Sequence, residues 1–137
     1  MAAKTDLIVA RASLRPALVP RLKAPRTGVA ILSCMDARLN VFAIFGLAEG
    51  DAHVIRNAGG CVTDDVIRSL AVSQSLGGTR EIVLLHHEDC AAVSDPGDDL
   101  RRCLARLRRA TLLPHTDAIR GFVYEAGGSL RESRPLE

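Results

Sequence analysis

Short apolar runs recur along the chain and are separated by segments with helical periodicity. Residues 29–32 are apolar at every position, which is typical of a strand buried on both faces. Similar runs, bounded by glycine or polar residues, follow later in the chain. The pattern predicts strands at Val29–Leu32, His53–Arg56, Ile82–Leu85 and Gly121–Tyr124.

The segments between these runs have the spacing of helices. Residues 39–47 are apolar enough for a short helix that ends near Gly46. Thr63 is a good N-cap for a second helix, which Gly77 and Gly78 would end. Residues 95–98 have the composition of a turn, after which apolar residues repeat at helical spacing. Those apolar residues are Leu100, Cys103, Leu104 and Leu107.

Strands that alternate with helices predict an α/β fold with a mainly parallel central sheet flanked by helices. In such sheets ligands bind beyond the carboxyl ends of the strands, where neighbouring connections leave in opposite directions. If the strand order is 2-1-3-4, that point lies between the first and third strands. We therefore look for chemistry after residue 32 and after residue 85.

The chain before the first strand is predicted to be an arm. Thr5 and Asp6 can cap a short helix with apolar residues Leu7, Ile8, Ala10 and Leu14. Pro16, Pro20 and Pro25 prevent that helix from continuing. We expect residues 1–137 to form a single domain, with residues 1–26 as an N-terminal arm that lies on the domain or, as we favour, wraps a partner subunit.

Composition narrows the class of protein. The 137 residues are 47% hydrophobic and carry a net charge of +2, without a basic run interleaved with aromatic residues, so we expect no nucleic-acid partner. No apolar stretch approaches the roughly 18 residues of a membrane span, so we expect no membrane partner and a cytoplasmic location. There the four cysteines are expected to be thiols or metal ligands rather than disulfides.

The segment Cys34-Met35-Asp36-Ala37-Arg38 carries the first candidate chemistry. Alternate residues of an extended segment point to the same side, so Cys34, Asp36 and Arg38 share one face if the chain stays extended. Met35 and Ala37 are then expected to pack behind them.

The third strand runs directly into a second polar segment, His86-His87-Glu88-Asp89-Cys90. The predicted topology brings it beside Cys34, and Cys34, His87 and Cys90 form a Cys2His set. Thiolates with one imidazole suit Zn2+, and three protein ligands with one open position are typical of a catalytic zinc site. Each residue alone is more simply a structural one, but together they favour a metal site.

Other polar residues have structural and functional interpretations. His53 and His86 can carry protons, but a structural role is simpler for each. Cys61 is either a packed small residue or an exposed thiol. Gly59 and Gly60 are expected to provide a tight backbone path near the pocket.

Three ordered segments carry a family resemblance. Cys34–Arg38, Arg56–Gly60 and His86–Cys90 resemble the signature segments of β-class carbonic anhydrases, especially the compact bacterial type. The similarity spans roughly residues 27–90 and is weaker over residues 113–124. It implies the strand order 2-1-3-4 and at least a homodimer, with the N-terminal arm packed on the partner.

The resemblance implies that Cys34, His87 and Cys90 bind Zn2+ and that Asp36 and Arg38 form a catalytic dyad. The reaction implied is reversible hydration of CO2 to bicarbonate by a zinc-bound hydroxide. Asp36 would orient that hydroxide while paired with Arg38, and would become a fourth ligand if it left Arg38.

Two departures from the family leave alternatives open. Glu88 and Ala91 stand where the family commonly has Thr and Gly, and the segment between Cys90 and the last long helix is shorter than usual. The same zinc site could hydrolyse carbonyl sulfide or carbon disulfide, or the chain could be a non-catalytic zinc-binding or protein-binding homologue.

Overall fold

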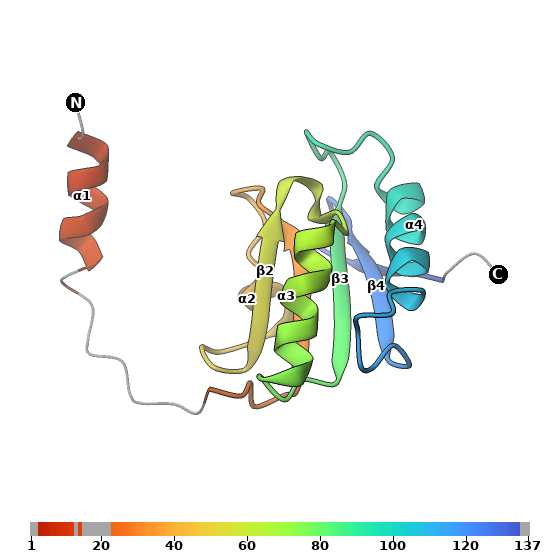
Figure 1. Cartoon of the computed structure of the whole chain (residues 1–137). Coiled ribbons are helices and arrows are strands. Elements are labelled where there is room, and N and C mark those ends of the chain that lie inside the picture. Colours follow the sequence, from red (N-terminus) through yellow and green to blue (C-terminus); the bar gives the residue numbers. More distant parts are fainter. Residues whose placement is uncertain (1–2, 13, 15–22, 135–137) are drawn as a thin grey trace.

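A five-stranded sheet forms the centre of the protein in the computed structural model, which describes residues 3–12, 14 and 23–134 (Figure 1). The strand order is β2-β1-β3-β4-β5. The first four strands pair in parallel, and β5 pairs antiparallel with β4. This confirms the predicted order 2-1-3-4. The strands are β1 (Val29–Cys34), β2 (Ala52–Asn57), β3 (Glu81–His87), β4 (Ile119–Tyr124) and β5 (Leu130–Ser133).

The sequence pattern predicts four strands and does not predict β5, which follows Gly127 and Gly128. The strand lies at the edge of the sheet and is largely exposed, so it has no apolar alternation to reveal it. An ion pair between Arg120 of β4 and Glu132 of β5, at 2.7 Å, joins the two strands.

Helices connect the parallel strands, as predicted. The Thr63 hydroxyl accepts a hydrogen bond from the backbone N–H of Val66, which caps the N-terminus of α3. The predicted turn at residues 95–98 is instead the start of α4, because Asp95 caps that helix and Pro96 occupies its first turn. The helices are α1 (Ala3–Ala12), α2 (Val41–Phe45), α3 (Asp64–Ser75) and α4 (Pro96–Arg108), with a 3-10 turn η1 at Ala58–Gly60.

The two faces of the sheet are covered unequally. One face packs against α3 and α4 through a core that includes Leu32, Leu70, Leu84 and Leu104, all at most 1% exposed. The other face packs against the much shorter α2 and includes Leu85. Figure 1 shows α3 in front of the sheet and α2 behind it. The α2 face is therefore less covered than the α3 face.

The N-terminal helix α1 is present as predicted, but it ends at Ala12, so Leu14 lies outside it. Leu7, Ile8 and Val9 are each more than half exposed. The predicted helix breakers Pro16 and Pro20 lie outside the described residues. Among the residues described, no helix is long and apolar enough to cross a membrane.

The carboxyl ends of the parallel strands β1, β2 and β3 lie at the same end of the sheet. β1 lies between β2 and β3, with Leu32 paired to Ile55 on one side and Leu84 on the other. The strand ends that meet there carry Cys34, Asn57 and His87. Both segments predicted to carry chemistry therefore emerge at the expected position in the fold.

Candidate metal and catalytic site

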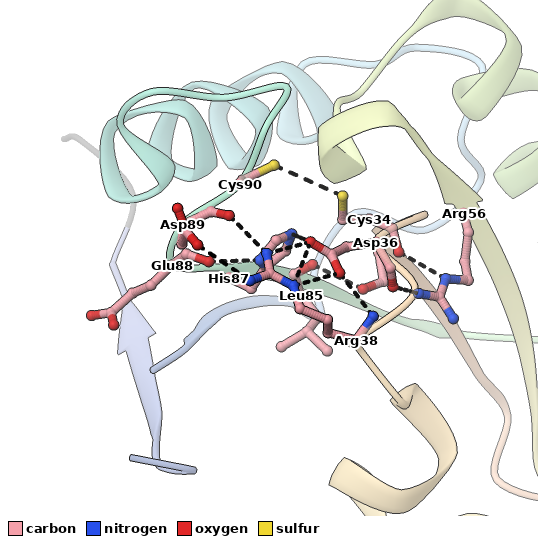
Figure 2. A network of polar contacts seen from close by, with 10 residues as sticks. Cys34, Asp36, Arg38, Arg56, Leu85, His87, Glu88, Asp89 and Cys90 are labelled. Atoms are coloured by element: carbon pink, nitrogen blue, oxygen red, sulfur yellow. Dashed lines mark hydrogen bonds and ion pairs between the residues drawn. The ribbon is translucent and has the colours of Figure 1, made fainter. Parts of the chain in front are cut away.

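The ends of β1 and β3 bring three predicted metal ligands together. Cys34 is the last residue of β1, His87 is the last residue of β3, and Cys90 lies in the loop that follows. The two sulfur atoms are 3.8 Å apart, and one ligand atom from each of the three residues lies within 4.8 Å of the others. Cys34 and His87 are buried, and Cys90 is partly buried. Figure 2 shows the two thiols facing each other across the strand ends.

The His87 imidazole is held in one orientation. Its Nδ1 lies 2.8 Å from the backbone carbonyl oxygen of Glu88, which accepts a hydrogen bond when Nδ1 carries the proton. Its Nε2 is buried and has no hydrogen-bond partner among the described residues. A buried nitrogen without a partner is costly, whereas a metal-binding histidine commonly donates its other N–H to a carbonyl. His87 therefore has the arrangement of a metal ligand.

The two thiols differ in acidity. Burial raises the pKa of Cys34, but the adjacent His87 imidazole and the backbone of Asp36 and Gly59 outweigh it, so the net shift is downward. The pKa of Cys90 is raised, chiefly by burial.

Asp36 and Arg38 form a tight ion pair beside these predicted ligands. Asp36 Oδ2 accepts from Arg38 Nη2 at 2.7 Å, and Oδ1 accepts from the Arg38 backbone N–H at 2.8 Å and from Nε at 3.0 Å. These hydrogen bonds lower the pKa of Asp36 well below its usual range. Asp36 Oδ2 also lies 3.8 Å from His87 Nε2, so the carboxylate borders the proposed metal position.

The backbone conformation that brings Arg38 to Asp36 differs from the predicted extended segment. The strand ends at Cys34 and the chain turns at residues 37–38, so Cys34, Asp36 and Arg38 do not share one face of an extended segment. Arg38 instead folds back onto Asp36. Met35 and Ala37 are exposed, so the expectation that they pack behind the site is wrong.

Arg56 hydrogen-bonds to the backbone of the segment Cys34–Asp36, a role that the sequence analysis did not assign to it. Its Nε donates to the Cys34 carbonyl at 2.7 Å, and its Nη2 donates to the Asp36 carbonyl at 2.8 Å (Figure 2). The only available signal was its position at the start of the second family-like segment. Arg56 fixes the backbone on both sides of Met35.

The two glycines of η1 allow the backbone to approach closely. Gly60 has φ +64°, and a Cβ there would lie 3.1 Å from the Ser33 carbonyl carbon and 3.2 Å from the Cys34 nitrogen. A Cβ on Gly59 would lie 2.6 Å from Val93 Cγ2. Both observations agree with the predicted tight backbone path.

The two residues between His87 and Cys90 add further contacts. Arg38 Nη2 donates to the Asp89 carbonyl at 2.9 Å, and Nη1 lies 3.2 Å from the Asp89 carboxylate. Asp89 has φ +53°, an uncommon value for a residue with a side chain. Glu88 accepts a hydrogen bond from the Ala126 backbone N–H at 3.0 Å, which ties this loop to the segment after β4.

A cavity of about 360 Å3 opens beside the ion pair. Arg38, Asp36 and His87 contribute polar groups to its wall, and Leu39 and Tyr124 contribute apolar surface. Glu88 also lines it, so this departure from the family pattern lies in the pocket wall. The cavity can admit a small molecule to the carboxylate and to the edge of the imidazole.

His53 and His86 lie away from this cavity. His53 Nδ1 is 2.7 Å from the Ser73 hydroxyl, and His86 Nε2 is 2.7 Å from Asp99 Oδ2. Neither lines the cavity beside Asp36. Both contacts agree with the structural interpretation that the sequence favoured.

Comparison with known proteins identifies the family. The carbonic anhydrase family profile matches residues 29–117. β-Carbonic anhydrase 1 of Mycobacterium tuberculosis is 45% identical over 139 residues, covering 81% of this chain and 85% of that protein. The crystal structure of a carbonic anhydrase from Streptococcus mutans has a TM-score of 0.83 and 35% identity, with 98% of each chain covered. The chain belongs to the β-class carbonic anhydrase family, as its signature segments implied.

A second group of relatives is similar over a shorter region. The carbon disulfide hydrolase of Saccharolobus solfataricus is 44% identical over 72 residues, which cover 53% of this chain and 35% of that protein.

Proposed function

We propose that this enzyme catalyses the reversible hydration of CO2 to bicarbonate with Zn2+ held by Cys34, His87 and Cys90. The observation that carries the proposal is the buried, unpartnered Nε2 of His87 beside two sulfur atoms 3.8 Å apart. Membership of the β-class carbonic anhydrase family supports the same reaction.

The donor set fits zinc. Thiolate sulfur and imidazole nitrogen are its usual protein ligands, and the 3.8 Å between the two sulfurs is compatible with two positions around one tetrahedral ion. The Nδ1 contact to the Glu88 carbonyl leaves the Nε2 lone pair available. Three ligands leave one position open, as catalytic zinc sites require.

When bound, zinc makes a water molecule acidic enough to supply a nucleophile near neutral pH, with a pKa of about 7 in carbonic anhydrases that use three histidines. Two thiolates donate more charge than two imidazoles, so a hydrogen-bond acceptor beside the open position becomes more useful. Asp36 is that acceptor in our proposal, because its carboxylate lies 3.8 Å from His87 Nε2.

Arg38 keeps Asp36 ionised and turned away from the metal. The guanidinium binds both carboxylate oxygens, at 2.7 Å and 3.0 Å, and is itself held by the Asp89 carbonyl at 2.9 Å. Without this clamp Asp36 would be free to rotate toward the ligands and block the open position. We therefore assign Asp36 and Arg38 as the catalytic dyad.

Hydrolysis of carbon disulfide or carbonyl sulfide is the second candidate, supported by the carbon disulfide hydrolase relative. These molecules and CO2 share a linear shape and an electrophilic central carbon, so the same site could attack either. We favour CO2 because the β-carbonic anhydrase relative is similar over much more of both chains. Direct competition between CO2 and carbonyl sulfide separates the two reactions.

We also propose that the chain acts as a homodimer or a larger homo-oligomer, with residues 1–26 as an arm that packs on a partner. Two sets of apolar surface support this. Leu7, Ile8 and Val9 of α1 are exposed, and the α2 face carries an apolar groove of about 240 Å3 beside Phe45 and Val83. Light scattering of the full chain, and of the chain from residue 27 onward, tests this assembly.

A reducing compartment would suit the proposed ligands, because both sulfurs must be available as thiolates. We accordingly propose a cytoplasmic location, which fractionation of the source cells tests.

The proposed zinc site is tested with Cys34→Ser and His87→Ala. Each variant should lose bound zinc, measured by elemental analysis, together with CO2 hydration, measured by stopped flow. His115→Ala is the control, since His115 pairs with Arg80 in a loop outside the cavity. Full zinc occupancy without turnover in the wild type would favour a non-catalytic homologue, and full zinc content in both ligand variants would refute the site.

A further inference from the structure

A second cluster of potential metal ligands lies on the opposite face of β3. Adjacent residues of a strand point to opposite faces of the sheet. His87 therefore faces the proposed zinc site of Cys34, His87 and Cys90, called the first site below, while His86 faces α4. His86 is 1% exposed and meets Asp99 and Cys103, which lie one turn apart on α4. One donor atom from each of these three residues lies within 4.8 Å of the others.

The cluster is centred on one carboxylate oxygen. Asp99 Oδ2 lies 2.7 Å from His86 Nε2 and 3.6 Å from the sulfurs of both Cys61 and Cys103. The other oxygen, Oδ1, lies 3.8 Å from Arg102 Nη2. An imidazole, a carboxylate and a thiol therefore form a compact group of donors, and the Cys61 thiol contacts the same carboxylate oxygen from a third segment.

We propose that Cys61, His86, Asp99 and Cys103 form a second metal site, which binds a thiophilic divalent cation such as Zn2+ or Cd2+. Its Cys2HisAsp donor set supplies four protein ligands, which is typical of a closed structural site. The first site has three ligands and an open position. The two sites would thus take the same metal for different purposes.

Charge balance separates this proposal from a simple hydrogen-bonded cluster. Without a cation, both thiols keep their protons and donate them to the Asp99 carboxylate. Binding of one divalent cation displaces both S–H protons and forms two metal–sulfur bonds. The proton that His86 Nε2 donates to Asp99 would move to Nδ1, so the imidazole stays neutral and Nε2 becomes free to bind the cation. Metal binding at this site therefore releases protons and weakens as the pH falls.

The second site would connect three parts of the fold. Asp99 and Cys103 belong to α4, His86 belongs to β3, and Cys61 follows η1. The Cys61 sulfur also packs close to the glycine turn: a Cβ added to Gly59 would lie 3.0 Å from it. A bound cation would therefore fasten α4 to the sheet and brace the glycine turn beside the first site.

The test is a metal titration of the reduced, metal-free full chain with Zn2+ and separately with Cd2+. The wild type should retain about two equivalents of tightly bound metal after gel filtration, and Cys103→Ala and Asp99→Asn should each retain about one. Calorimetry in buffers of different ionisation enthalpy should show that Cys103→Ala releases fewer protons than the wild type. Asp99→Asn preserves the shape of the side chain if loss of Cys103 disturbs folding.

Cys34→Ser separates this inference from the proposed function. It should remove only the first equivalent, so the second site is observed even in a chain without CO2 hydration. A wild type that holds a single equivalent would overturn the proposal. So would a second equivalent that persists unchanged in both Cys103→Ala and Asp99→Asn, because that metal would be bound elsewhere.

Discussion

Replacement of Gly60 by alanine tests whether the close packing of η1 against β1 positions Cys34, the first of the proposed metal ligands. Gly60 has φ +64°, and an added Cβ would meet backbone atoms of Ser33 and Cys34 at 3.1 Å and 3.2 Å. Backbone atoms in a buried strand cannot rotate away as a side chain can. Gly78 provides a matched control, since its φ is +72° but the nearest atom to an added Cβ is 3.8 Å away.

The two variants share one energetic cost and differ in another. Left-handed backbone costs alanine about 1–2 kcal/mol, which applies to both positions. Overpacking against the end of β1 adds about 1–3 kcal/mol at Gly60 alone. We therefore expect Gly60→Ala to lower the free energy of unfolding by about 1–3 kcal/mol more than Gly78→Ala does.

The strain at Gly60 should also reach the proposed zinc site, because the contacted nitrogen belongs to Cys34. We expect Gly60→Ala to weaken zinc binding roughly 10–100-fold, the range for loss of groups that support a ligand, whereas Gly78→Ala leaves it unchanged. Urea unfolding of the metal-free chains measures stability, and competition with a chelator measures zinc affinity. Equal destabilisation of both variants, with normal zinc affinity in Gly60→Ala, would refute this reasoning.

Three further results are expected. Arg38→Gln should lower the rate of CO2 hydration roughly 10–100-fold at normal zinc content. Arg68→Gln is the control, because it removes a similarly exposed arginine, paired with Asp65, and should leave the rate unchanged. Equal stopped-flow rates for the two variants would contradict the role of Arg38. Arg38 lowers the pKa of Asp36, so the stabilisation from this pair is complete above the unfolded pKa of about 4 and is lost as the pH falls through the lower folded value. Asp36→Asn should therefore reduce the loss of unfolding free energy on acidification, and identical acid profiles would argue against the pair. Thr63→Ala should cost about 1 kcal/mol in urea unfolding through loss of the α3 cap, and an unchanged midpoint would show that the cap contributes nothing.

Much of the fold could be predicted because its parallel strands are buried and its turns carry strong local signals. Residues 29–32 are apolar throughout, and Thr63 and Gly77 mark the limits of α3. β5 was not predicted because an exposed edge strand has no apolar pattern. The start of α4 was misassigned because Asp95-Pro96 suits both a turn and a helix N-terminus, and only the packing of the following residues distinguishes them.

The sequence by itself identified the candidate residues for the chemistry of this protein. The thiols, imidazole, carboxylate and guanidinium stand in two of the three short segments whose order indicates the family. Only the tertiary structure decided how they meet. Arg38 reaches Asp36 through a turn rather than along a strand, Arg56 supports the backbone of Cys34, and His86 and His87 serve opposite faces of β3. These outcomes depend on contacts between residues distant in the chain, which local patterns do not encode.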